Sequence, residues 1–121
     1  MSVYALRGAT TVEENDREAI LEATREMLDE LLSRNSLAAE DLVSAIFTVT
    51  DDLNAEFPAV AAREMGLAAV PLLCAREIPV PGSMPGVIRV LVHYRAGEGS
   101  EAQHVYLRRA SELRSDLGSA Q

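Results

Sequence analysis

The sequence predicts an α+β (α/β-like) domain in which a mixed β-sheet carries one long helix and a short second helix. Residues 11–35 have the apolar periodicity of a helix, and several short apolar runs between Pro, Gly and Asn indicate strands. The 121 residues suit a single domain, 1–121, and the apolar content of 48% is ordinary for a globular protein.

The first part of the chain predicts a strand followed by the long helix. Residues 2–8 alternate as a short strand, and Gly8 would allow a backbone turn at its end. Thr11 and the glutamate three residues later have the spacing of a capping box, and Asn35 suits a left-handed helix end. Apolar or small side chains recur along one helical stripe, at positions 20, 23, 24, 27, 28, 31 and 32.

The second half predicts the rest of the sheet and the short helix. Residues 42–50, "LVSAIFTVT", indicate a strand that is apolar on both faces. Pro58 at a first helical position and Gly66 at a C-terminal cap bound a helix of about two turns. Further strands are predicted at residues 69–74 and 87–94, with a last short strand within 104–114.

This set of elements predicts an oligomer. One long helix covers only one face of the sheet, but the strands at 42–50 and 87–94 are apolar on both faces. The chain has too few remaining elements to bury the second face alone. We therefore expect subunits that pack their sheets together through a closed symmetry.

The charge of the chain argues against two classes of partner. The 11 basic and 19 acidic residues give a formal net charge of −8, which repels nucleic-acid backbones and anionic lipid surfaces. No apolar run approaches the roughly 18 residues that span a bilayer, and a signal-peptide core is missing. A single cysteine cannot form an internal disulfide. We therefore expect a cytoplasmic protein with no nucleic-acid and no membrane partner.

Several kinds of chemistry are disfavoured by what the sequence lacks. Every basic residue is arginine, so a lysine Schiff base is excluded. The two histidines, His93 and His104, have no metal-ligand spacing with Cys74. The segment "PGSMPG" at 81–86 indicates a turn and lacks the pattern of a phosphate-binding loop. We therefore expect neither a cofactor nor a metal.

Arg89 is the most informative residue, because it interrupts an apolar strand. An arginine inside a fold needs an anion opposite it, which could be Glu77 or a bound ligand. Arg7 lies in the first predicted strand, and two arginines could bind one carboxylate with bidentate geometry. Cys74 has no neighbouring histidine in the sequence and is a poor nucleophile. These residues predict an anion-binding site without an evident nucleophile.

Four segments together resemble the small monofunctional chorismate mutases of the trimeric pseudo-α/β-barrel class. They are "LRGATTVEEN", "FPAVAAREMG", "VPLLCAREIPVPGSMPGVIRVLVHY" and "HVYLRRASELRSDL". The resemblance implies conversion of chorismate to prephenate, a Claisen rearrangement on the route to phenylalanine and tyrosine that uses no cofactor and no covalent intermediate. It also implies a homotrimer whose active sites lie between subunits.

The resemblance implies roles for individual residues. Arg89 matches the arginine that binds the substrate's ether oxygen and one carboxylate. Arg7 matches the arginine on the enolpyruvyl carboxylate, which Tyr106 also contacts, and Glu77 and Cys74 match the partners of the ring hydroxyl. The matches to the apolar lining are Phe57, Ala59 and Leu73, and those to the mouth of the pocket are Arg63, Leu113 and Arg114.

The same resemblance divides the site between chains. It places Arg7, Cys74, Glu77, Arg89 and Tyr106 on one chain and residues 57–63 on the next. One departure is Val60, which cannot supply a cation to the ring carboxylate and so gives Arg63 more importance. Two other functions fit the residues alone: a trimeric module that binds small carboxylates, and an enamine/imine deaminase. Both would also use arginine to bind a carboxylate.

Overall fold

The computed structural model describes the backbone of residues 1–116 and the side chains of residues 1–113. The strands are β1 (Ser2–Thr11), β2 (Leu42–Val49), β3 (Leu72–Arg76), β4 (Val87–Ala96) and β5 (Val105–Tyr106). The helical elements are α1 (Arg17–Arg34), η1 (Ala39–Asp41), α2 (Ala59–Ala62), η2 (Arg63–Leu67) and η3 (Arg108–Asp116). The predicted class, with one long helix and a short second one, is confirmed.

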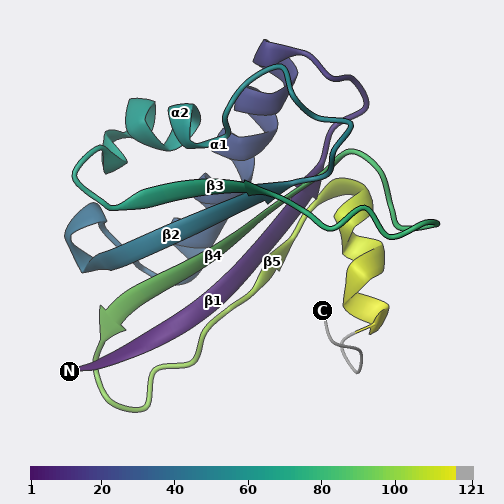
Figure 1. The fold of residues 1–121 in the computed structure, drawn as a ribbon. Helices are drawn as coiled ribbons and strands as arrows, with labels where there is room; N and C mark the ends of the chain where they lie inside the picture. Colours follow the sequence, from purple (N-terminus) through teal and green to yellow (C-terminus); the bar gives the residue numbers. More distant parts are fainter. Residues whose placement is uncertain (117–121) are drawn as a thin grey trace.

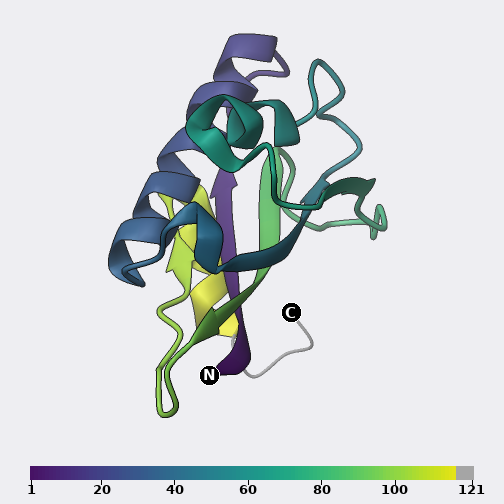
Figure 2. The ribbon, with the colours of Figure 1, turned by 90° about the vertical axis from the view of Figure 1, so that its left-hand side faces the viewer.

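The five strands form one mixed sheet in the order β3-β2-β4-β1-β5. The central strand β4 is antiparallel to both β2 and β1, while β3 and β5 add in parallel at the two edges. Helices α1 and α2 lie on the same side of this sheet (Figures 1 and 2) and pack against each other. One face of the sheet is therefore left without a helical layer.

The register decides which side chains share the face that α1 does not cover. Arg89 on β4 pairs with Thr48 on β2 and with Ala9 on β1. Arg7 pairs with Leu91, two residues along β4. Paired residues point to the same side of a sheet and alternate residues share a face. Both arginines therefore point away from α1.

The prediction of a backbone turn at Gly8 is wrong. It lies in the middle of β1, which continues to Thr11. An added Cβ would lie 3.1 Å from Cδ1 of Leu31 on α1 and 3.2 Å from Cγ1 of Val90 on β4. The glycine therefore allows α1 to approach the sheet closely and makes no turn.

Both predicted ends of the long helix are wrong in detail. Because Thr11 belongs to β1, the helix begins later, and the carboxylate of Asp16 accepts the N–H of Ala19 at 3.1 Å as its N-cap. At the other end Asn35 has a φ of −106° and Ser36 takes the left-handed conformation, with a φ of 52°. Asn35 instead uses its side-chain amide to donate to the backbone oxygens of Leu31 and Gln103.

The later elements follow the prediction with shifted bounds. The short helix begins directly after Pro58 and continues through η2, where Gly66 has a φ of +95°. The third strand begins at Leu72, three residues later than predicted, because the chain still turns at residues 68–70. The predicted last strand is only β5, and the rest of that segment forms η3, which packs against β1.

The loop between β3 and β4 returns to the sheet through Gly86, which has a φ of +67°. A Cβ at this position would lie 2.5 Å from the backbone oxygen of Val12, so only glycine fits. The Gly86 N–H donates to both oxygens of the Asp52 carboxylate, at 3.0 and 3.3 Å. This contact ties the start of β4 to the end of β2.

Candidate active site

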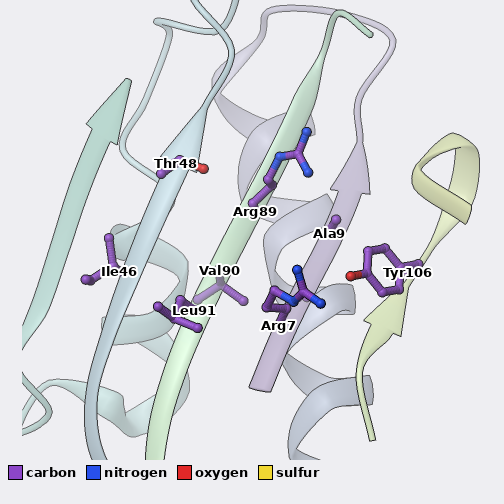
Figure 3. A pocket seen from close by; sticks show the side chains of 9 residues that line it. Arg7, Ala9, Ile46, Thr48, Arg89, Val90, Leu91 and Tyr106 are labelled. Carbon is purple, nitrogen blue, oxygen red and sulfur yellow. The ribbon is translucent and has the colours of Figure 1, made fainter. Parts of the chain in front are cut away.

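The two predicted arginines lie in one pocket on the open face of the sheet, with a volume of about 240 Å³. We call it the arginine pocket. Arg7 extends from β1, Arg89 from β4 and Tyr106 from β5, and the tyrosine hydroxyl points toward the arginines (Figure 3). The complete lining is Arg7, Gly8, Ala9, Ile46, Thr48, Arg89, Val90, Leu91 and Tyr106.

Glu77 is an anion that pairs with Arg89. The Nε of Arg89 donates to Oε2 of Glu77 at 2.8 Å, and the hydroxyl of Thr48 donates to the same oxygen at 2.7 Å. The N–H of Glu77 donates to the backbone oxygen of Val49, so Glu77 continues the pairing of β3 with β2. Neighbouring strands therefore bring the carboxylate, the hydroxyl and the guanidinium together on one face.

This ion pair is half-buried, which strengthens and orients it. The side chain of Arg89 is 27% exposed and that of Glu77 is 17% exposed. Solvent and salt screen such a pair less than a surface pair, and its charge-assisted hydrogen bond has a defined direction. Because the bond is made by Nε, it fixes the rotation of the guanidinium plane of Arg89. The sheet thus holds a cation at one place and in one orientation.

Arg7 is held through its backbone by His104. The Arg7 N–H donates to Nδ1 of His104 at 3.0 Å, next to the short parallel pairing of β1 with β5. In that pairing Ala9 lies opposite Tyr106, which places the phenol at the pocket. His104 is an exposed residue, but partial burial of its ring lowers its pKa, and the positive charge of Arg7 lowers it further.

Cys74 lies in a different pocket from the arginines. This second hollow, the Phe57 pocket, has a volume of about 350 Å³. Because Cys74 pairs with Phe47, it points to the helix side of β3, opposite to the face that carries Arg89. Within one chain the structure therefore separates Cys74 from Arg7 and Arg89, which were expected to lie together with it. The lining is Val49, Leu53, Asn54, Ala55, Glu56, Phe57, Pro58, Cys74, Ala75 and Arg76.

Four further predicted site residues, all with described side chains, line neither pocket. Ala59 is buried in the core at the start of α2, and Arg63 is exposed at the start of η2. Leu73 on β3 is 61% exposed on the open face, and Leu113 is half-buried in η3. Arg114 belongs to the backbone of η3, but its side chain lies outside the described residues.

Sequence reasoning missed Thr48 and the contact of His104 with Arg7. Thr48 is polar within the apolar run 42–50, and Ile46 two residues earlier marks the same strand face. Residues two apart in a strand share a face, so this spacing could have identified Thr48 as a neighbour of Arg89 once β2 was known to pair with β4. His104 carried no such signal, because its contact depends on the parallel approach of β5 to β1.

Two features are absent from the part of the chain that the structure describes. Within that part of the chain, no three side chains of His, Cys, Asp or Glu are grouped as ligands for a metal ion. The described helices are also too short or too polar for any of them to cross a membrane.

Comparison with known proteins finds relatives of this chain in one family. The sequence model of the family "Chorismate mutase type I" matches residues 3–117. Chorismate mutase AroH of Thermus thermophilus is 54% identical over 121 residues, covering 98% of this chain and 99% of the relative. Chorismate mutase AroH of Bacillus subtilis (strain 168) is 38% identical, covering 97% of this chain and 94% of the relative.

A solved structure gives the same result at the level of the fold. A chorismate mutase from Clostridium thermocellum superposes with a TM-score of 0.87 at 45% sequence identity, covering 91% of this chain and 99% of that chain. The chain therefore belongs to the type I chorismate mutase family.

Proposed function

We propose that the protein converts chorismate to prephenate by a non-covalent Claisen rearrangement. The observation that carries this proposal is the position of Arg89. Its half-buried guanidinium extends from the central strand into a pocket that Arg7 and Tyr106 also line. The reaction breaks an ether C–O bond and forms a C–C bond within one molecule. It therefore needs a defined substrate conformation and stabilisation of charge, and it needs no nucleophile.

Arg89 would act on the charge that develops during the rearrangement. As the C–O bond breaks, the ether oxygen becomes partly negative and the ring partly positive. A guanidinium whose plane is already fixed by Glu77 can donate to that oxygen without reorganising. The interaction is stronger in the transition state than in the ground state, so it accelerates the reaction.

The neighbouring residues would position the substrate. Arg7 and the Tyr106 hydroxyl point into the same pocket and can bind the enolpyruvyl carboxylate (Figure 3). The Glu77 carboxylate, next to Arg89, can accept the ring hydroxyl and favour a partly positive ring. An acceleration of about a million-fold requires roughly 8 kcal/mol. One preorganised donor supplies about 3 to 4 kcal/mol, and positioning would have to supply the rest.

The complete site would be formed between subunits of a homotrimer in the cytoplasm. The arginine pocket and the Phe57 pocket have no lining residue in common within one chain. Phe57 is 65% exposed and Leu73 61% exposed, and such side chains gain stability when a neighbouring subunit covers them. We propose that the Phe57 pocket of one subunit, including Cys74, faces the arginine pocket of the next.

The direct test of the activity is to follow chorismate by its absorbance with purified protein, adding neither metal nor cofactor. We expect chorismate to disappear and prephenate to form in equal amounts. A protein that binds chorismate without turning it over would instead be a carboxylate-binding module. Hydrolysis of an enamine without prephenate formation would identify a deaminase.

The shared site is tested by mixing two inactive variants. Arg89→Ala removes the cation, and Phe57→Arg blocks the second pocket. If each site takes one part from each of two subunits, roughly a quarter of the sites in randomly mixed trimers contain both intact parts. We expect activity to reappear after joint unfolding and refolding, and light scattering to report a trimer. Mixtures without activity would contradict a site shared between subunits.

A further inference from the structure

His104 extends the pairing between β1 and β5 with a side chain in place of a backbone oxygen. The two strands pair in parallel at Gly8 with Val105 and at Ala9 with Tyr106. One residue earlier on β1, the N–H of Arg7 donates to Nδ1 of the His104 imidazole at 3.0 Å. The imidazole therefore binds the backbone of a residue whose side chain lines the arginine pocket.

We propose that His104 is a positioning residue whose neutral imidazole fixes the backbone of Arg7, so that protonation of His104 weakens substrate binding in mild acid. This inference rests on the proposed function, in which Arg7 binds a substrate carboxylate. His104 acts through Arg7 and lines neither pocket.

The hydrogen bond requires a neutral imidazole. A ring nitrogen that accepts a bond carries no proton, whereas both ring nitrogens of an imidazolium are donors. Protonation of Nδ1 would thus turn an acceptor into a donor that faces the N–H of Arg7. The same step would place a second positive charge beside the Arg7 guanidinium.

The surroundings of His104 favour its neutral form near neutral pH. His104 is an exposed residue, but partial burial of its ring lowers its pKa below the ordinary 6.5, and the positive charge of Arg7 on β1 lowers it further. On the helix side, Asn35 binds the backbone N–H and oxygen of the adjacent Gln103 with a neutral amide. None of the causes that shift this pKa is a carboxylate of the described residues. The bond is therefore intact near neutral pH and is lost as the pH falls through the lowered pKa.

The effect should appear in KM more than in kcat. In the proposed mechanism Arg7 binds a carboxylate that is present in both the ground state and the transition state. Loss of such uniform binding raises KM and leaves kcat nearly unchanged. A residue that only supported folding would lower the amount of active enzyme, which reduces the apparent kcat and leaves KM unchanged.

The test compares three variants across about pH 5 to 8. In His104→Asn the amide oxygen can take the place of Nδ1 and accept the Arg7 N–H, but it does not titrate. His104→Ala removes the acceptor. His93→Asn is the matched control, because His93 is the other histidine of the chain and its Nδ1 lies 3.4 Å from the Ser44 hydroxyl of β2, whereas the Arg7 N–H donates to His104.

We expect the KM for chorismate to rise in acid in the wild type and in His93→Asn, and to stay nearly constant in His104→Asn. In His104→Ala the KM should depend little on pH and should lie about three- to ten-fold above the wild-type KM measured at neutral pH, as expected for loss of one hydrogen bond. The inference is overturned if His104→Asn keeps the wild-type pH dependence, or if His104→Ala keeps the wild-type KM.

A second measurement does not depend on mutase activity or on the folding of any variant. NMR on the wild-type protein can follow the titration of the His104 ring together with the hydrogen-exchange protection of the Arg7 amide. We expect that protection to fall with the same midpoint as the ring titrates. Constant protection would overturn the role of His104 even in an active enzyme, whereas a protein with coupled titration but no turnover would overturn only the proposed function.

Discussion

The Nε of Arg89 and Oε2 of Glu77 lie 2.8 Å apart, joining a residue of β4 to the residue that follows β3. Strand β2 lies between them in the sheet, and its Thr48 donates to the same carboxylate oxygen. A single oxygen atom therefore links three strands. The orientation of Arg89 depends on this link, because Arg89 has mostly apolar neighbours on its own strand.

Arg89→Lys should lower kcat by about a hundred-fold or more while changing KM much less. Lysine keeps the charge but has no Nε donor and no planar fork, so it cannot bind Glu77 and the ether oxygen together. Steady-state kinetics measure both parameters. The control is Arg95→Lys on the same strand, at an exposed position outside the arginine pocket. Equal losses in binding and turnover would mean that Arg89 binds the substrate without stabilising charge.

Thr48→Val should lower kcat about ten-fold, because it removes a donor to the charged Glu77 at nearly constant side-chain volume. Thr48→Ser keeps the hydroxyl and should restore most of the activity. Both variants should fold normally, as circular dichroism would show. If the serine variant were as slow as the valine variant, the lost methyl contact and not the hydrogen bond would explain the effect.

Asp52→Asn should change how stability depends on pH. Burial alone would raise the pKa of Asp52, but hydrogen bonds from the Thr50 hydroxyl and from the N–H groups of Gly86 and Asp52 itself lower it below 3.8. A lowered carboxyl pKa contributes stability above pH 3.8 that is lost as the pH falls through the folded-state pKa.

Thermal unfolding across the acid range would check this prediction. The wild type should melt higher than Asp52→Asn near neutral pH, and the difference should shrink as the pH falls below 3.8. Asp51→Asn is a suitable control. Asp51 is the adjacent residue in the chain and is exposed, and the Gly86 N–H donates to the Asp52 carboxylate and not to that of Asp51. A constant difference in melting temperature would show that the asparagine acts through something other than charge.

Thr10→Val should raise the free energy of unfolding by about 1 kcal/mol. Thr10 is fully buried beneath α1, and its hydroxyl is the one buried side-chain polar atom without a partner among the described residues. Denaturant unfolding would measure the change. Thr24→Val is the matched control: that buried hydroxyl donates to the Ile20 oxygen at 2.7 Å, so its loss should bring no gain. A destabilised Thr10→Val would indicate that the hydroxyl has a partner in the assembled protein.

Most of the fold could be predicted from local pattern. The helical stripe of α1, the doubly apolar run of β2 and the Pro58 to Gly66 helix each carry their signal within a few turns or residues. The errors fell where tertiary contacts override local preference. Gly8 resembled a turn residue because the sequence does not show that α1 and Val90 approach it closely.

The candidate site could be predicted in part for the same reason. Arg89 was recognisable because a charged residue in an apolar strand needs an anion, and Glu77 was one of the two anions considered. Thr48 and His104 could not be identified, because each acts on a residue of another strand. Cys74 was expected beside the arginines, but within one chain it lies in the Phe57 pocket, because the side of β3 to which it points depends on the register with β2.

The amino-acid sequence alone determined which segments are helices and strands, and that an arginine on an apolar strand would require a negative partner. Only the tertiary structure decided that Glu77 is this partner, how the guanidinium plane of Arg89 is rotated, and that the arginine pocket and the Phe57 pocket are separate. The physical reason is that periodicity along the chain encodes the face on which a side chain lies. The order of strands in the sheet, which brings residues 7, 48, 77, 89 and 106 together, arises only from pairing between distant segments.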